Sequence, residues 1–303
     1  MAQLSLKFCE DCKETSNILS SKMIRKVKNT ILSVEQAEGV GARVRRSVGG
    51  AQLRNLDPFL LLDEFRVKPP AGFPEHPHRG FETVTYMLNG KFTHEDFCGH
   101  KGTIGPGDLQ WMTAGRGIVH SEMPAKDTDE GHGLQLWINL RSTEKMCEPA
   151  YQELVAGDIP KPSKNGVTVA VISGESLGAK SKVYTRTPTM YLDFKLESGA
   201  KIEQPVPKGW TAFVYTLSGD LSISGTEVAS HHTAILDDGE FVALENLEKE
   251  LSHFVLVAGQ PINEPIVQQG PFVMNTREQI SQAINDFHNG QNGFEKAASW
   301  KRS

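Results

Sequence analysis

Short runs of alternating apolar and polar residues, separated by turns rich in Gly, Pro and Asp, occupy most of the chain from residue 30 onward. The clearest runs are residues 43–48, 83–88, 134–140, 167–172, 191–196 and 212–217. An alternation with a period of two places every second side chain on one face of a strand, and the closely spaced turns leave little room for helices. The pattern therefore predicts an all-β fold built from antiparallel sheets.

The same pattern occurs twice, which suggests an internal duplication. The chain has 303 residues, more than one hydrophobic core usually spans. Tyr86 opens the segment Tyr-Met-Leu-Asn-Gly-Lys and Tyr215 opens Tyr-Thr-Leu-Ser-Gly-Asp, each a strand that ends in a polar turn with glycine. A polar, proline-containing stretch at residues 159–166 separates the halves. We therefore predict two β-domains, over residues 33–160 and 161–275.

The two ends of the chain differ from the rest. Residues 1–32 are rich in Lys and Ser and show no clear period, which is typical of a loosely ordered extension. In residues 276–303, Thr276 and Gln279 have the spacing of a capping box in front of an amphipathic run. Two glycines then separate this run from a second segment at residues 294–300. We expect two short helices at this end.

Charge and cysteine content exclude several classes of protein. The formal net charge of -5 is mild and spread along the chain, so a large basic surface for nucleic acid is not expected. The 4 cysteines lack the spacing of a disulfide-rich secreted domain, and no charged leader or long apolar segment is visible. We therefore expect an intracellular, soluble protein that neither enters a membrane nor binds DNA or RNA directly.

Two pairs of polar residues with a spacing of two are the main candidates for a functional site. His76 and His78 form one pair, and His120 and Glu122 form the other. In strands, the members of each pair point to one face. A lone His-x-His segment is often only a half-buried polar face, but a second pair favours a shared site. Three imidazoles and a carboxylate suit Fe, Mn, Ni, Cu or Zn and leave two octahedral positions open for water, dioxygen or a bidentate substrate.

The segments around these pairs are similar to those of a known family. They resemble the pirins of the cupin superfamily, and animal pirins in particular. The resemblance rests on residues 55–65, 75–82, 107–117, 117–124 and 270–275. It implies two jelly-roll (cupin) β-barrels, of which the first holds one iron ion (Fe2+/Fe3+) and the second has lost its metal. The iron ligands that it implies are His76, His78, His120 and Glu122.

Two glutamates compete for the fourth position of the site. The general cupin pattern favours a glutamate shortly after His-x-His, and Glu82 stands there with the same strand parity as His78. Glu122 shares a face with His120, and pirins resemble one another at that position. We therefore predict Glu122 as the ligand. Glu82 is a candidate for orienting an imidazole, and either glutamate could act as general base.

The resemblance implies both an enzyme and a regulator. Pirins resemble quercetin 2,3-dioxygenases, so the iron is expected to bind a flavonol such as quercetin while dioxygen cleaves its ring. Pirins are also linked to nuclear factor kappa B, which implies a nuclear coregulator whose iron redox state alters a surface that contacts Rel-type transcription factors and their coactivators. We expect coregulation to be the physiological role of a monomer in nucleus and cytoplasm. The alternative is a metabolic dioxygenase for flavonol-like substrates with no transcriptional role.

Other side chains are weaker candidates, because each has an ordinary structural role as well. Those that could line the mouth of the site or simply fill the barrel core are Phe73, Trp111, Met112 and Trp137. Those that could receive an anionic group or form ion pairs at the rim are Arg79 and Arg116. Those that could form a basic contact face or a solvated strand and turn are Arg43, Arg45, Arg46 and Lys91. The histidines expected at the surface or in turns are His94, His100 and His132.

Overall fold

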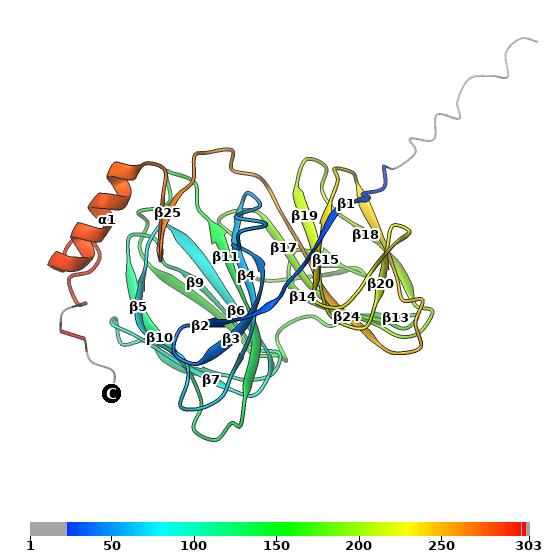
Figure 1. The fold of residues 1–303 in the computed structure, drawn as a ribbon, viewed down its shortest axis with the longest axis horizontal. Coiled ribbons are helices and arrows are strands. Elements are labelled where there is room, and N and C mark those ends of the chain that lie inside the picture. The colour runs from blue at the N-terminus through cyan, green and yellow to red at the C-terminus, as the bar shows by residue number, and fades with distance from the viewer. Residues whose placement is uncertain (1–22, 298, 301–303) are drawn as a thin grey trace, which may run out of the picture.

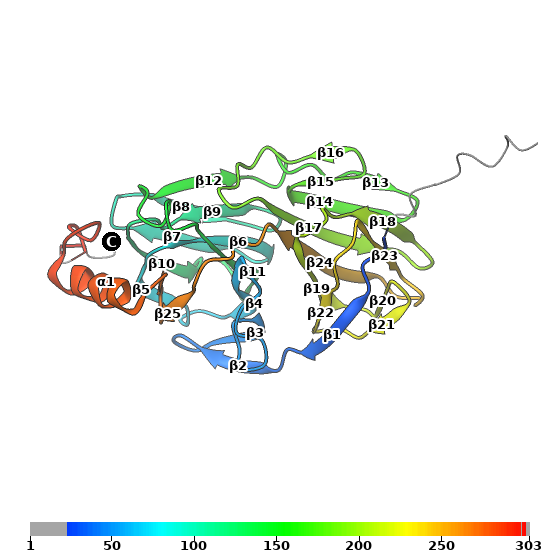
Figure 2. The same ribbon diagram turned by 90° about the horizontal axis from the view of Figure 1, so that it is seen from above.

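The computed structural model describes residues 23–297, 299 and 300, which form two β-barrels side by side (Figures 1 and 2). This part of the chain contains 26 strands and one helix, so the predicted all-β fold is confirmed. Each barrel consists of a seven-stranded and a four-stranded sheet. The strand pairs within these sheets are antiparallel, as the short alternating runs predicted. Among the described residues, no helix is both long and apolar enough to cross a membrane.

The N-terminal barrel carries the two pairs of candidate ligands on its small sheet. The strands of its large sheet, in spatial order, are β12 (Ala150–Leu154), β9 (Leu109–Thr113), β6 (Phe81–Asn89), β11 (Gly131–Asn139), β4 (Phe59–Val67), β3 (Ala42–Val48) and β2 (Glu35–Glu38). The strands of its small sheet are β5 (Phe73–His78), β10 (Ile118–Pro124), β7 (Phe92–Asp96) and β8 (Lys101–Ile104). A hairpin of two further strands, β25 (Val267–Gln269) and β26 (Phe272–Met274), lies beside this barrel (Figure 1).

The C-terminal barrel repeats the strand order of the first. Its large sheet contains β1 (Val27–Leu32), β22 (His232–Leu236), β19 (Thr211–Ser218), β24 (Ser252–Gly259), β17 (Thr189–Leu196), β14 (Val167–Ser173) and β13 (Ser163–Lys164). Its small sheet contains β18 (Lys201–Pro205), β23 (Phe241–Glu245), β20 (Leu221–Ile223) and β21 (Thr226–Val228). The remaining hairpin is β15 (Glu175–Ser176) with β16 (Ala179–Lys180). The strands β18 and β23, which take the places of β5 and β10, carry no histidine.

The start of the described chain crosses from one barrel to the other. Strand β1 pairs with β22 of the C-terminal barrel, whereas β2 and β3 belong to the N-terminal barrel. Just before β1, the buried guanidinium of Arg25 donates hydrogen bonds to the carbonyl oxygens of Trp210, Asp237 and Pro207. We had expected a loosely ordered extension over residues 1–32. That expectation is wrong for β1, whose largely exposed side chains mark an edge strand without an apolar period, and residues 1–22 lie outside the described residues.

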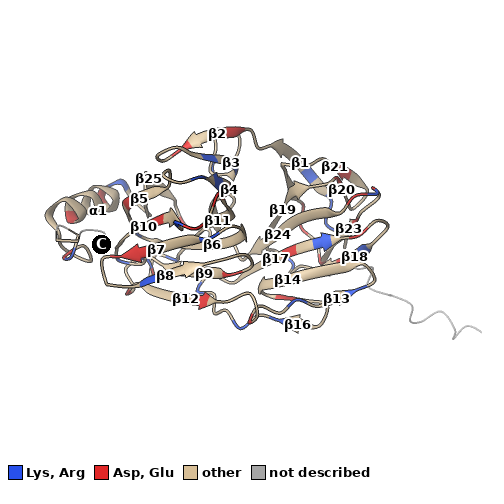
Figure 3. Ribbon diagram, turned by 90° about the horizontal axis from the view of Figure 1, so that it is seen from below, with Lys and Arg blue, Asp and Glu red and all other residues tan. Residues whose placement is uncertain are grey.

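Acidic side chains neutralise the arginines and lysine of the predicted basic contact face. Figure 3 shows acidic and basic residues interspersed over both barrels. Arg43 pairs with Glu35 at 2.8 Å, and Lys91 pairs with Asp127 at 2.6 Å. Arg46 lies between two carboxylates, at 2.7 Å from each. The mild net charge is therefore also balanced locally, and these side chains form no free basic patch.

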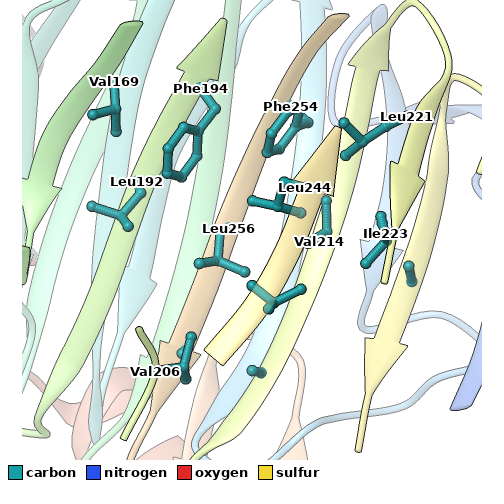
Figure 4. Close-up of a cluster of buried hydrophobic side chains, with 14 of the residues drawn as sticks. Val169, Leu192, Phe194, Val206, Val214, Leu221, Ile223, Leu244, Phe254 and Leu256 are labelled. Carbon is teal, nitrogen blue, oxygen red and sulfur yellow. The ribbon is translucent and has the colours of Figure 1, made fainter. Parts of the chain in front are cut away.

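Apolar side chains fill the C-terminal barrel and also join it to the N-terminal barrel. Inside the C-terminal barrel, Phe194 and Leu256 point inward from neighbouring strands and are fully buried (Figure 4). Between the barrels, outward-facing residues of both large sheets form one shared core. In this core Phe59 of the first barrel meets Phe213 of the second edge to face, with ring centroids 5.5 Å apart. Because of the shared core, the two barrels are one packed unit rather than two domains joined only by a linker.

Two equivalent polar clusters also join the barrels. The hydroxyl group of Tyr86 in the first barrel donates to Asp193 in the second, at 3.0 Å. Conversely, the hydroxyl group of Tyr215 in the second barrel donates to Glu64 in the first, at 2.7 Å. These are the two tyrosines that open the repeated sequence segments. Each carboxylate also contacts a histidine of its own barrel, at 2.6 Å for Asp193 with His253 and 2.9 Å for Glu64 with His132.

The one helix of the described residues, α1 (Arg277–Asn289), packs against the N-terminal barrel and the β25–β26 hairpin (Figure 1). Thr276 and Gln279 form the predicted capping box, and Gly290 ends the helix in a left-handed conformation. The predicted second helix is absent from the described residues, where residues 295–297 and 299 are in turns. Asn292 and Gly293, both with positive φ, bend the chain before this segment.

Candidate metal centre

Antiparallel pairing of β5 with β10 gathers three histidines. His76 lies opposite His120, and His78 lies opposite Ile118. The ring centroids of the three imidazoles are 4.5 to 4.9 Å apart. Each ring offers a nitrogen within 4.8 Å of those of the other two. The spacing of two within each strand thus brings the side chains to one face, as predicted.

The state of these imidazoles suits metal binding. Burial, together with the neighbouring His76, holds the pKa values of His78 and His120 well below the usual range for histidine, so both rings are neutral at neutral pH. Both ring nitrogens of His78 and Nδ1 of His120 are buried without a hydrogen-bond partner. Unpartnered buried nitrogens are unfavourable unless a ligand satisfies them, and a metal ion requires the neutral ring.

The separation between His76 and His120 also fits a shared ion. Nδ1 of His76 donates to the carbonyl oxygen of Pro74 at 2.7 Å, because a carbonyl can only accept, and this leaves Nε2 with a free lone pair. Nε2 of His76 and Nε2 of His120 are 3.0 Å apart. Two nitrogens at about 2.1 Å from an octahedral ion are about 3.0 Å apart. The three residues therefore fit one divalent transition metal ion.

Glu122 lies beside the histidines in the same pocket. Its carboxylate is buried and accepts hydrogen bonds from Oγ1 of Thr85 at 2.8 Å and from Nε2 of Gln135 at 3.1 Å. It lies outside the close group of three nitrogens. Thr85 and Gln135 were not predicted from the sequence, and the available signal was a polar residue between apolar neighbours in each strand. They fix the carboxylate in the pocket wall, where it can serve as a ligand or a proton acceptor.

Glu82 points away from the histidines, toward the face of the large sheet that packs against the other barrel. It is on the same face of β6 as Val84 and Tyr86, which belong to the core between the barrels. Oγ1 of Thr113 donates to its carboxylate at 2.7 Å, and burial raises the pKa of Glu82 to about 6. Gly80, with φ +90°, reverses the chain between β5 and β6. The alternation of side-chain direction holds only within one strand, so it cannot be counted from His78 of β5 through this turn to Glu82 of β6. The structure does not bring Glu82 to the histidines.

A pocket of about 600 Å³ is lined by three of the four candidate ligands, His76, His78 and Glu122. Of the four predicted apolar residues, Phe73 and Trp137 line it. The ring of Trp137 meets that of His78 edge to face, with centroids 5.2 Å apart. Trp111 and Met112 instead are fully buried in other hydrophobic clusters. The walls of the pocket are thus partly aromatic next to the histidines.

The two arginines near the ligands in sequence have structural partners. Arg79 is buried, with Nη1 at 2.7 Å from Asp286 of α1 and its guanidinium over the ring of Phe294. Arg116 pairs with Glu148 at 2.9 Å. The arginine that does line the pocket is Arg46, which sequence analysis had assigned only to a contact face. Arg79 and Arg116 are therefore not positioned to receive a substrate group.

Two antiparallel barrels, one with three histidines gathered in a pocket, define a bicupin with a candidate metal centre. Comparison with known sequences identifies the family. The family model for pirin matches residues 41–138, and that for the pirin C-terminal cupin domain matches residues 191–293. The chain is 64% identical to Pirin of Homo sapiens over 282 residues, which cover 91% of this chain and 97% of the human protein. The chain belongs to the pirin family, and the predicted resemblance is confirmed.

Solved structures share this fold. A quercetin 2,3-dioxygenase from Acinetobacter baumannii is 37% identical, with a TM-score of 0.82, and the match covers 88% of this chain and 98% of that one. The bacterial pirin YhhW from Escherichia coli, solved in complex with nickel(II), has a TM-score of 0.63 at 18% identity, covering 77% of this chain and 99% of that one. The latter likeness shows the fold alone.

Proposed function

We propose that this chain is an iron-dependent dioxygenase that cleaves flavonols such as quercetin, with one iron ion in the N-terminal barrel. The observation that carries the proposal is the group of three imidazoles, two of them buried with unpartnered nitrogens, beside a pocket of about 600 Å³. Pockets of this size accommodate small aromatic ligands. The 37% identity to the quercetin 2,3-dioxygenase from Acinetobacter baumannii supports the same reaction class.

We assign the iron ligands to His76, His78, His120 and Glu122. A bound iron ion would supply Lewis acidity and redox chemistry toward dioxygen. The carboxylate of Glu122 is also the group that we assign to accept the proton of a flavonol hydroxyl, because it is buried in the pocket wall on the strand that carries His120. Its hydrogen bonds from neighbouring strands hold it still, which lowers the cost of orienting it for proton transfer.

The walls of the pocket suit a flat aromatic substrate. Trp137 and Phe73 offer aromatic surface next to the histidines and keep water from the reacting groups. Gln268 and Arg46 line the same pocket; Arg46 is paired with Glu38 and Asp63 through Nε and Nη2, and its Nη1 and the amide of Gln268 are the groups that offer donors for the phenolic oxygens of a flavonol. The pocket therefore combines an apolar slot with a few polar groups, the usual design of a small-molecule site.

Oxygen consumption tests this proposal. Protein loaded anaerobically with Fe(II) should consume dioxygen when quercetin is added. We expect His78→Ala to abolish the reaction and Glu122→Gln to slow it by about 100-fold or more, the usual loss for a general base. Glu82→Gln is the matched control and should retain the wild-type rate. Equal rates in wild type and His78→Ala would reject the assigned iron site. A large loss of rate in Glu82→Gln alone would assign the general base to Glu82 instead of Glu122.

Metal analysis of the purified protein tests the choice of iron. Three histidines and a carboxylate also suit nickel and manganese, so the ligand types do not select one metal. We expect about one iron per chain, lost in His78→Ala. A protein that carries nickel or manganese instead, and is active only with it, would keep the site but replace the metal.

We further propose that the protein acts as a monomeric coregulator in nucleus and cytoplasm, binding transcription factors of the Rel/nuclear factor kappa B type and their coactivators. Its support is membership of the pirin family, together with a pocket that runs from His76 and His78 to the β2–β3 rim at Glu38 and Arg46. Through this rim the redox state of the iron can alter an outer surface. Because the nearby arginines are paired with acids, a protein fits this surface better than bare nucleic acid.

A pull-down separates the two roles. The oxidised and reduced iron forms should retain different amounts of a Rel-family dimer bound to its DNA. Size-exclusion chromatography with light scattering should find one chain per particle. Equal retention by both forms would remove the redox switch and leave the alternative, a metabolic dioxygenase for flavonol-like substrates with no transcriptional role.

A further inference from the structure

A second group of potential metal ligands lies in the N-terminal barrel and shares no residue with the lining of the pocket. His94 of β7, His100 of the turn before β8, and Glu153 of β12 each offer a donor atom within 4.8 Å of the other two. Nε2 of His94 is 2.9 Å from Oε1 of Glu153, and Nε2 of His100 is 3.9 Å from Oε2. Both histidines had been expected to be ordinary surface or turn residues. The fold instead brings them to one carboxylate 59 and 53 positions later in the sequence (153 minus 94 and 153 minus 100).

The buried histidine of this group makes no hydrogen bond through Nε2. The side chain of His94 is 4% exposed, and this nitrogen has no hydrogen-bond partner although Oε1 of Glu153 lies 2.9 Å away. Nδ1 of His100 is also buried and unpartnered. A Cβ atom on Gly102 would come within 2.5 Å of Nε2 of His94, so the glycine leaves this nitrogen open. Such an open, buried nitrogen requires an explanation, and a bound cation supplies one.

Neighbouring residues hold the group in position. Asp96 accepts hydrogen bonds from the backbone N–H groups of Cys98 and His100, at 2.7 and 2.9 Å, and so fixes the turn that carries His100. The hydroxyl group of Tyr151 donates to Asp96 at 2.8 Å, and its ring stacks on His100 with centroids 4.1 Å apart. The buried Gln110 donates to Oε1 of Glu153 at 2.8 Å. Partners of this kind orient the ligands of known metal sites.

We propose that His94, His100 and Glu153 bind a second divalent transition metal ion of the zinc class. Two imidazoles and one carboxylate, with water in the fourth position, form a tetrahedral set that zinc accepts. Ligand atoms at about 2.1 Å from a tetrahedral ion lie about 3.4 Å apart. Nε2 of His94 is 2.9 Å from Oε1 of Glu153 and Nε2 of His100 is 3.9 Å from Oε2, so the carboxylate has to turn to present one oxygen to the ion. Small side-chain rotations complete the site. His100 and Glu153 are 35% and 37% exposed, which gives the ion a path from solvent.

The second site adjoins the proposed iron site but uses different side chains. His94 of β7 lies opposite Glu122 of β10 in the register of the small sheet, so the two side chains point to the same face. None of the three residues of the second group lines the pocket of the first. Loss of an ion from the second site would thus leave the residues of the pocket wall in place.

Metal titration of the full-length protein tests the second site. After removal of metal with a chelator, calorimetric titration with Zn2+ should give two ions per chain for the wild type and one for His100→Ala/Glu153→Gln. Titration with Co2+ should give the visible spectrum of a tetrahedral ion, retained in His76→Ala/His78→Ala and lost in His100→Ala/Glu153→Gln. Gln110→Ala should raise the Kd for Zn2+ at this site about 10- to 100-fold. The buried His94 is left intact so that the variants fold.

The outcomes distinguish the two sites. His288→Ala, a substitution of an exposed histidine on α1, is the control and should bind zinc as the wild type does. If the wild type binds one ion and His100→Ala/Glu153→Gln none, the second site stands and the first site fails. If His100→Ala/Glu153→Gln binds as many ions as the wild type, with the same tetrahedral Co2+ spectrum, the second site is rejected.

Discussion

At the scale of single residues, two buried glutamates of the N-terminal barrel have opposite pKa shifts. Burial raises the pKa of Glu82 to about 6, although Thr113 donates to it. Burial would also raise the pKa of Glu64, but hydrogen bonds from His132 and Tyr215 outweigh it, so the pKa of Glu64 lies below its usual range. A shifted pKa links folding to pH, and the sign of the link differs between the two.

Glu82→Gln should stabilise the protein at neutral pH. The folded state holds the proton of Glu82 up to pH of about 6, whereas the unfolded state releases it near pH 4, so wild-type stability falls as pH rises through this window. A shift of this size corresponds to about 2 kcal/mol. We expect the free energy of unfolding of Glu82→Gln to exceed that of the wild type by about this amount at pH 7.5 and to match it below pH 4, as measured by urea titration.

Glu64→Gln provides the opposite control. The ionised form of Glu64 is favoured in the folded state, so its contribution is present above the unfolded pKa and is lost as pH falls through the folded one. Glu64→Gln should therefore destabilise the protein at pH 7.5 and show a shrinking effect in acid. A loss of stability in both variants at pH 7.5 would contradict the assigned environment of Glu82.

The same residues show what the sequence could predict. His76 with His78, and His120, were predictable because strand parity holds within one strand and needs no knowledge of its neighbours. Glu82 was misplaced because the count ran through the turn at Gly80. The placement of Gln135 beside Glu122 depends on how the strands are arranged in the two sheets of the barrel. A single sequence does not show the order of the strands in a sheet.

At the scale of elements, α1 was predictable and β1 was not. The capping box of Thr276 and Gln279 is a local signal, because both hydrogen bonds lie within one turn of helix. Strand β1 is an edge strand with mostly exposed side chains, and its partner β22 is about 200 residues away in the sequence. What attaches α1 to its barrel is also non-local, namely the buried ion pair of Arg79 with Asp286.

Asp286→Asn should loosen α1. The substitution leaves the guanidinium of Arg79 buried without a counter-charge, and breaking such a pair costs about 3 to 5 kcal/mol. We expect faster hydrogen exchange throughout α1 together with a lower free energy of unfolding. Asn285→Ala, an exposed substitution on the same helix, should leave both unchanged. Unaltered exchange in Asp286→Asn would show that apolar packing alone holds the helix.

At the scale of the whole molecule, the duplication has a consequence that the repeated segments did not suggest. Tyr86 and Tyr215 occupy equivalent strands, β6 and β19, yet each donates to a carboxylate of the other barrel. The sequence showed that the segments are alike but not that they face each other, because the hydrogen bonds join residues 107 and 151 positions apart. The interface between the barrels thus contains the same hydrogen bond twice, each time between equivalent strands of the two barrels.

Tyr86→Phe and Tyr215→Phe should each destabilise the protein while leaving its unfolding cooperative. Each substitution removes one hydrogen bond to a buried carboxylate, which costs about 1.5 to 3 kcal/mol. Because the two hydrogen bonds have no shared partner, the double variant should lose about the sum.

The shared core predicts a single thermal transition in calorimetry for the wild type and all three variants. Tyr184→Phe, at a residue 65% exposed, is the control and should unfold as the wild type does. Two separate transitions in the double variant would show that these tyrosines, rather than the apolar core, make the barrels unfold together.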